Sequence, residues 1–133
     1  GIDIAVDGKE GHKIISPRDG VVQVAISDYK SHPKANRTWV KNGGNQVWIT
    51  HDAENGKSYS SRFLHLQNIA PNLKVGDKVS KGQVIGTLGN TGIGTGPHLH
   101  YTVRDVTGGA NKKVNPLNIL MNEWFGGSKT WIG

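Results

Sequence analysis

The sequence predicts a mainly β fold: an antiparallel β-sandwich or open barrel with long loops and one short C-terminal helix. Three observations lead to this prediction. Short runs of β-branched and aromatic residues recur at intervals of about ten residues. Glycine accounts for 19 of the 133 residues without a collagen-like period, which is typical of tight turns between short strands. One segment alone has both a helix start signal and apolar residues to pack.

The strand pattern is clearest in the middle of the chain. In Asn45–His51, Val47 and Ile49 alternate with Trp48 and Thr50, as in a strand with two different faces. The turn at 52–56 ends in Asn-Gly and predicts a hairpin with a returning strand at 57–66. The remaining expected strands are 20–26, two short pieces within 74–79 and 81–89, and 98–104.

The helix is expected at 115–124, where Asn115 would be the N-cap and Pro116 the first helical residue. The length fits one domain, which we place at residues 1–125, followed by a tail at 126–133. The polar, basic stretch 28–44 is the one long break in the β pattern and is interpreted as a surface loop.

The composition excludes several classes of protein. With no cysteine, the chain has no disulfide scaffold, no thiolate metal site and no cysteine nucleophile. No run approaches the roughly 20 apolar residues of a membrane span, and the first residues lack a signal-peptide pattern. The net charge of +6 favours a polyanionic partner without naming one.

His98 and His100 form the strongest local chemical signal. Residues two apart on a strand point to the same face, so both imidazoles would enter one space. The preceding stretch 89–97 contains four glycines, which lets its backbone approach a neighbour closely. From spacing alone, the two histidines are exposed side chains, two metal ligands, or one ligand and one base.

His65 and Asp3 are weaker signals when taken singly. His65 lies in an apolar strand, where a histidine is more often structural than catalytic. Asp3 interrupts an apolar stretch, and a buried carboxylate needs a cation, a metal or hydrogen bonds. Together with His98 and His100, they suggest a metal site of the carboxylate–imidazole kind that Zn²⁺ takes.

The order of several motifs resembles the M23 metallopeptidases, the lysostaphin- and LytM-like zinc endopeptidases that cut peptidoglycan peptides. The similarity covers residues 1–104, and its Gly-Pro-His-Leu-His block is quite specific. The motifs are GIDIA at 1–5, SPRDGVV at 16–22, GGNQV at 43–47, FLHL at 63–66, VGDKV at 75–79 with GQVIG at 82–86, and TGPHLH at 95–100.

The resemblance implies a role for each candidate residue. Asp3 matches the aspartate of the family's H-x-x-x-D motif, and His100 matches the second histidine of H-x-H, so both are expected to bind Zn²⁺. His98 and His65 match the two catalytic histidines. The histidine of H-x-x-x-D would fall two residues before Gly1, so we expect the chain to be a fragment of a longer protein. His12 is not expected to replace that ligand.

The implied activity is zinc-dependent hydrolysis of a peptide bond in the stem peptide or cross-bridge of peptidoglycan, outside the cell or in the cell wall. Lysostaphin-like members favour glycine bridges and others cut stem peptides; the parent could be a bacteriocin, an autolysin or a phage-tail enzyme. Zinc would polarise the carbonyl, His98 would take the water proton, and His65 would stabilise the oxyanion. We expect a monomer. The 28–44 loop would contact anionic cell-wall polymers or line the substrate groove through Tyr29 and Trp39.

Three alternatives remain open. A degenerate LytM-like domain would lack catalysis and act as a scaffold or activator of cell-wall hydrolases. A biotinyl or lipoyl carrier is suggested by residues 74–88, but a carrier needs no histidines and usually displays its lysine beside methionine, whereas Met121 lies in the expected helix. Nucleic-acid binding is permitted by the charge, but no recognisable motif supports it.

Overall fold

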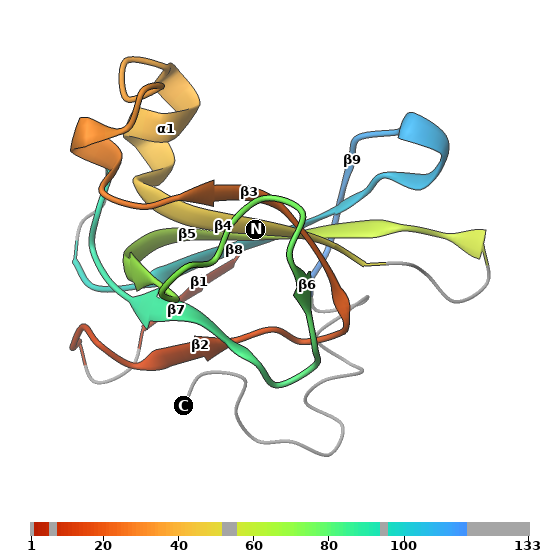
Figure 1. Cartoon of the computed structure of the whole chain (residues 1–133), viewed down its shortest axis with the longest axis horizontal. Coiled ribbons are helices and arrows are strands. Elements are labelled where there is room, and N and C mark those ends of the chain that lie inside the picture. Colours follow the sequence, from red (N-terminus) through yellow and green to blue (C-terminus); the bar gives the residue numbers. More distant parts are fainter. Residues whose placement is uncertain (1, 6–7, 52–55, 94–95, 117–133) are drawn as a thin grey trace.

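The strands form one antiparallel sheet that remains open (Figure 1). This computed structural model describes residues 2–5, 8–51, 56–93 and 96–116. Over these residues the strands are β1 (Ile2–Ile4), β2 (Lys13–Ile15), β3 (Gly20–Ile26), β4 (Asn45–His51), β5 (Tyr59–Ile69), β6 (Lys78–Val79), β7 (Val84–Leu88), β8 (Leu99–Asp105) and β9 (Lys112–Val114). The helical elements are the short α1 (Thr38–Gly43) and the 3-10 turns η1 (Tyr29–Ser31) and η3 (Thr107–Gly109).

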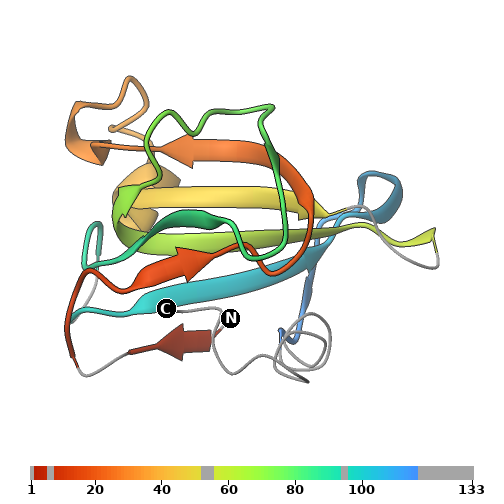
Figure 2. The same cartoon turned by 60° about the horizontal axis from the view of Figure 1, so that its bottom comes forward.

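The main path of the sheet runs β1-β8-β5-β4-β3-β6. β9 pairs with β8, while β7 pairs with the end of β5 and carries β2 on its other side. Figure 2 shows β1, in dark red, at the edge beside β8. The N-terminal strand therefore lies next to the strand that follows the Gly-rich stretch, far away in sequence.

One face of the central strands builds the core. Phe63 and Tyr101 are fully buried with ring centroids 5.0 Å apart, and Val47 and Ile49 pack in the same cluster. Because side chains alternate along a strand, the residues between these project from the opposite face. That opposite face carries the polar and charged side chains described below.

The core also contains a buried polar chain of hydrogen bonds. His51 is fully buried; its Nδ1 donates to the carbonyl oxygen of Asp19 at 2.9 Å, and its Nε2 accepts from the Ser61 hydroxyl at 2.7 Å. The Tyr101 hydroxyl lies 3.4 Å from Ser61 Oγ. Burial lowers the pKa of His51 and raises the pKa of Tyr101, which keeps both side chains neutral.

A bulge interrupts β5 at Leu64 and His65. Val47 pairs with Phe63 but Asn45 pairs with Leu66, so β5 has one residue more than β4 across this interval. His65 has φ 64°, in the left-handed region that few residues other than glycine adopt. Beyond the bulge β5 pairs with β7, so His65 lies where the strand changes partners.

The mainly β, antiparallel and open architecture confirms the predicted fold class. β3 and β4 have the predicted bounds, whereas β5 begins two residues later and ends three residues later than predicted, and β8 is shifted by one residue toward the C-terminus. The prediction that 28–44 is a surface loop is wrong in part. This segment contains η1 and α1, and Val40 of α1 is buried. β2 and β9 were not predicted, since each has three residues and no alternation to reveal it. The expected helix from residue 117 onward and the tail lie outside the described residues.

No helix in the described ranges has the length and apolar character needed to cross a membrane.

Candidate functional site

The four predicted site residues meet at one end of the sheet. Asp3 on β1 is the register partner of His100 on β8, and His100 is in turn the partner of Leu64, next to His65. The ring centroid of His65 lies 4.8 Å from that of His98 and 6.1 Å from that of His100. Residues far apart in the sequence are thus neighbours because β8 lies between β1 and β5.

Asp3 and His100 are directly hydrogen-bonded. Nδ1 of His100 lies 2.7 Å from Oδ1 of Asp3, and Nε2 of His98 lies 3.8 Å from the same oxygen. The hydrogen bond to His100 holds the pKa of Asp3 below its ordinary value, with slight burial opposing it. The Asp3 side chain is 65% exposed, so the pair is open to solvent.

Backbone carbonyls fix the tautomers of the other two histidines. Nδ1 of His98 donates to the carbonyl of Gly96 at 2.6 Å, and Nδ1 of His65 donates to the carbonyl of Thr91 at 2.7 Å. In a neutral ring with a protonated Nδ1, Nε2 carries the lone pair. Burial lowers the pKa of His65, so its neutral form is favoured. Both rings therefore present Nε2 as a proton acceptor.

Thr91 ties the Gly-rich stretch to the sheet. Its hydroxyl donates to the carbonyl of Leu66 at 2.5 Å and accepts from the backbone N–H of Asn45 at 3.0 Å. Ile93 N–H adds a bond to the carbonyl of Asn42 at 3.1 Å. The carbonyl that orients His65 is therefore held by three segments of the chain.

The donor chemistry of the Asp3–His100 pair suits zinc, which binds carboxylate oxygen and imidazole nitrogen. Catalytic zinc sites use about three protein ligands. Within the described residues, no group of three or more His, Cys, Asp or Glu side chains has the arrangement needed to hold an ion. Asp3 and His100 are therefore of the chemical type that binds zinc, and they supply part of a ligand set.

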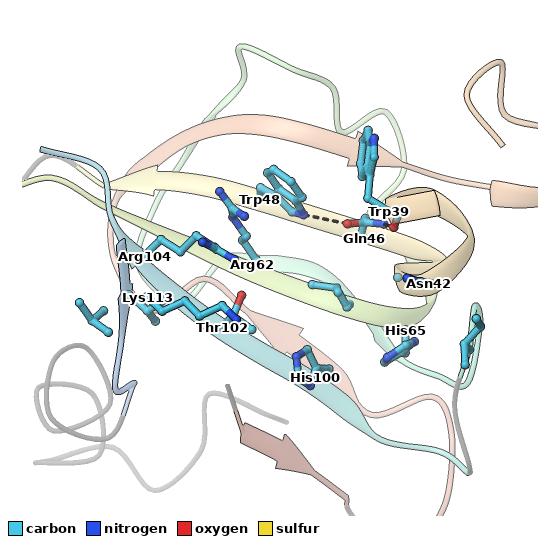
Figure 3. A pocket seen from close by; sticks show the side chains of 15 residues that line it. Trp39, Asn42, Gln46, Trp48, Arg62, His65, His100, Thr102, Arg104 and Lys113 are labelled. Carbon is cyan, nitrogen blue, oxygen red and sulfur yellow. Dashed lines mark hydrogen bonds between the residues drawn. The ribbon is translucent and has the colours of Figure 1, made fainter. Parts of the chain in front are cut away.

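A groove of about 780 Å³ runs from the histidines along the open face of the sheet. Figure 3 shows His65 and His100 at one end and Trp48, Arg62 and Arg104 toward the other. The tryptophan wall is formed by Trp39 of α1 and Trp48 of β4, whose ring centroids lie 5.5 Å apart. His65 and His100 thus lie at one end of a groove that is lined further along by aromatic and cationic side chains.

Comparison with known proteins matches the sequence to a family. The family model described as "Peptidase family M23" matches residues 1–116. The chain belongs to peptidase family M23.

Among M23 relatives, the peptidoglycan DD-endopeptidase ShyA of Vibrio cholerae is 44% identical over 91 residues, covering 68% of this chain and 17% of ShyA. The structure of LytU superposes with a TM-score of 0.62 at 33% identity, covering 87% of this chain and 68% of LytU. A zinc-containing peptidase from Vibrio cholerae gives a TM-score of 0.52 at 33% identity, covering 73% of this chain and 23% of that one. The chain thus spans less than a fifth of ShyA.

Family membership confirms the resemblance proposed from the sequence motifs. Of the two aromatic residues expected at an M23 substrate groove, Trp39 lines the groove, whereas Tyr29 is not among the lining residues. Sequence reasoning missed the charged and aromatic lining residues Trp48, Arg62, Arg104 and Lys113. The available signal was alternation: Trp48 alternates with Val47 and Ile49 and so faces away from them, and the same alternation applies to its strand partner Arg62.

Proposed function

We propose that this M23 domain is a zinc-dependent endopeptidase that hydrolyses peptide bonds in peptidoglycan. The observation that carries the proposal is the Asp3–His100 pair, at 2.7 Å, beside His98 and His65 at the end of the groove. Support comes from the names of the relatives: ShyA is called a peptidoglycan endopeptidase, and one structural neighbour is called a zinc-containing peptidase.

Asp3 and His100 would hold the zinc, together with the histidine that the family's H-x-x-x-D motif places four residues before the aspartate. Zinc supplies Lewis acidity, which polarises a peptide carbonyl and makes water more acidic. His100 contacts Asp3 through its Nδ1. Once the proton on this nitrogen is displaced, its lone pair would be free to bind the ion. The strand pairing between β1 and β8 keeps both side chains in place before any ion binds.

His98 would act as general base and then as general acid. Its Nδ1–H is engaged by Gly96, so Nε2 is the atom that takes a proton from water and passes it to the leaving amine. His65 would stabilise the oxyanion after its Nε2 takes up a proton from solvent, since its Nδ1–H is committed to Thr91. The 4.8 Å separation of the two rings allows them to serve one reacting group.

The proposal extends to the bounds of the domain, its oligomeric state and its location. The domain would extend over residues 1–125, work as a monomer and act at the cell wall outside the cell. The cations of the 28–44 stretch would contact anionic wall polymers, since these side chains are exposed: Lys30, Lys34, Arg37 and Lys41.

The experiment uses a chain extended upstream of Gly1 so that the H-x-x-x-D motif ending at Asp3 is complete. Wild type, His98→Ala and the control His12→Ala are incubated with purified peptidoglycan, and the released peptides are identified by mass spectrometry. We expect wild type and His12→Ala to cleave, and His98→Ala to lose cleavage while keeping its zinc. Near wild-type cleavage by His98→Ala would falsify its role. A wild type that binds no zinc and cuts nothing, yet stimulates another hydrolase, would favour the activator alternative.

A further inference from the structure

We propose that the groove recognises a carboxylate on the substrate through Arg62 and Arg104, with Lys113 beside them. The inference rests on the proposed function and sharpens it: the substrate is an acidic peptide, such as a stem peptide with free carboxyl groups, and not an uncharged glycine bridge. The three cations lie on the same face of the sheet as the histidines, at the other end of the groove (Figure 3).

Strand register places the cations next to one another. Arg62 on β5 pairs with Trp48 on β4 and with Thr102 on β8. Arg104 follows Thr102 by two residues on the same strand, so its side chain is on the same face, and it pairs with Lys113 on β9. Three strands thus contribute to one cationic patch, which we define as Arg62, Arg104 and Lys113.

Among the described residues, no acidic side chain pairs with the cationic patch. In the part of the chain that the structure describes, no Asp or Glu lines the groove and no ion pair involves Arg62, Arg104 or Lys113. Arg62 is half-buried, and burial, followed by repulsion from Arg104, lowers its pKa to about 10. Partly desolvated like charges are unfavourable without a counter-ion, and an anion between them would remove that repulsion.

Arg62 is already oriented to bind. Its guanidinium carbon lies 3.9 Å from the centroid of the Trp48 ring, and its Nε reaches Ser60 Oγ at 3.5 Å. Trp48 is itself held by a 2.8 Å bond from Nε1 to Oε1 of Gln46. A stacked guanidinium keeps its remaining N–H groups in one plane, which suits the two oxygens of a carboxylate.

The position along the strand indicates where the carboxylate lies on the substrate. Arg62 is level with Thr102, two residues from His100, and Arg104 is four residues from His100. At about 3.3 Å per residue, this is roughly 7–13 Å from the candidate metal ligand. An extended substrate would therefore carry its carboxylate about two to four residues from the scissile bond.

The test measures binding to the zinc-free protein, so it does not depend on cleavage. The probes are a stem peptide of peptidoglycan with blocked ends and free internal carboxyl groups, the same peptide with those groups as primary amides, and a blocked glycine peptide. Calorimetry should give about tenfold or more tighter binding for the acidic peptide, the size expected for charged hydrogen bonds, and the difference should shrink in high salt.

Two sets of variants assign the preference to these residues. Arg62→Gln and Arg104→Gln should each bring the acid-to-amide ratio close to one, with Lys81→Gln, an exposed cation outside the groove, as the charge control. Lys113→Gln should reduce the ratio while Lys112→Gln, its exposed neighbour outside the groove, leaves it unchanged. Because both lysines lie on the outer strand β9, this pair gives an answer even where an arginine variant does not fold.

Equal binding of the acidic and amidated peptides by wild type would overturn the inference, whatever the cleavage assay shows. A preserved acid preference in a protein that cuts nothing would refute the peptidase activity and leave carboxylate recognition standing. Binding of a glycerol phosphate polymer by wild type that is lost in Arg104→Gln, without measurable binding of the acidic peptide, would assign the patch to phosphate polymers and overturn the proposal.

Discussion

Gly44 and Gly92 pack backbone against backbone: a Cβ on Gly44 would lie 2.5 Å from the backbone nitrogen of Gly92. This contact joins the end of α1 and the start of β4 to the Gly-rich stretch. Thr91, adjacent to Gly92, supplies the carbonyl that holds His65. The orientation of a candidate catalytic residue thus depends on two positions where no side chain fits.

Gly92→Ala should therefore destabilise the fold and disturb His65. Its Cβ would come within 2.6 Å of Gly44 N and 2.7 Å of Asn42 O, both backbone atoms that cannot easily move. We expect a loss of about 1–3 kcal/mol from the left-handed backbone, plus a similar amount from overpacking. Urea unfolding measures the change.

Gly82→Ala is the matched control, because Gly82 has φ +86° and a Cβ at this position would have no atom within 4 Å. It should show the backbone cost alone. Equal losses in Gly82→Ala and Gly92→Ala would mean that the close approach contributes nothing.

Gln46→Leu should loosen the tryptophan wall of the groove. The buried Gln46 amide accepts from Trp48 Nε1 at 2.8 Å and donates to the carbonyls of Trp39 and Gly44 at 3.3 and 3.2 Å. Leaving buried polar groups unpaired costs about 1–3 kcal/mol each. Urea unfolding and tryptophan fluorescence should both change, whereas the exposed control Gln23→Leu should leave fluorescence as in wild type.

Asp3→Ala and His100→Ala should each lower zinc content in the chain extended through the H-x-x-x-D motif, because each removes one proposed ligand. Loss of a ligand typically weakens a site far more than loss of an outer contact, for which about 10–100-fold is usual. Metal analysis after dialysis provides the measurement, with His12→Ala as a histidine control. Full zinc occupancy in Asp3→Ala would remove Asp3 from the ligand set.

The stability of the fold should fall in mild acid because of His51. Unfolded His51 takes up a proton near pH 6.5, whereas in the folded protein burial lowers its pKa. The unfolded state then binds more protons, so the contribution is complete above about pH 6.5 and is lost by up to about 1.4 kcal/mol per pH unit below it. Urea titrations from pH 7.5 to 5.5 should show a shallower fall for His51→Gln, which does not titrate. Parallel curves for the two proteins would contradict this assignment.

Local pattern was enough to predict the strands whose two faces differ. β4 was predictable because Val47 and Ile49 alternate with Trp48 and Thr50. The chemistry of Asp3, His98 and His100 was enough to single them out as candidates, while their proposed roles came from the family resemblance. The bulge at His65 was not, because it depends on β5 pairing with β8 on one side of it and with β7 on the other. Arg62 and Arg104 are unremarkable in sequence and become a pair only through strand register.

The edge position of β1 has a consequence for how the site comes together. β1 is joined to β8 by three residue pairs and by the hydrogen bond between Asp3 and His100, which are 97 positions apart in the sequence. An ion shared by these two residues would act as a cross-link that closes this long loop, much as a disulfide does. Removing that ion with a chelator should therefore loosen the edge strand β1 first. The amide hydrogens of β1 should then exchange faster, while those of the central strands stay protected.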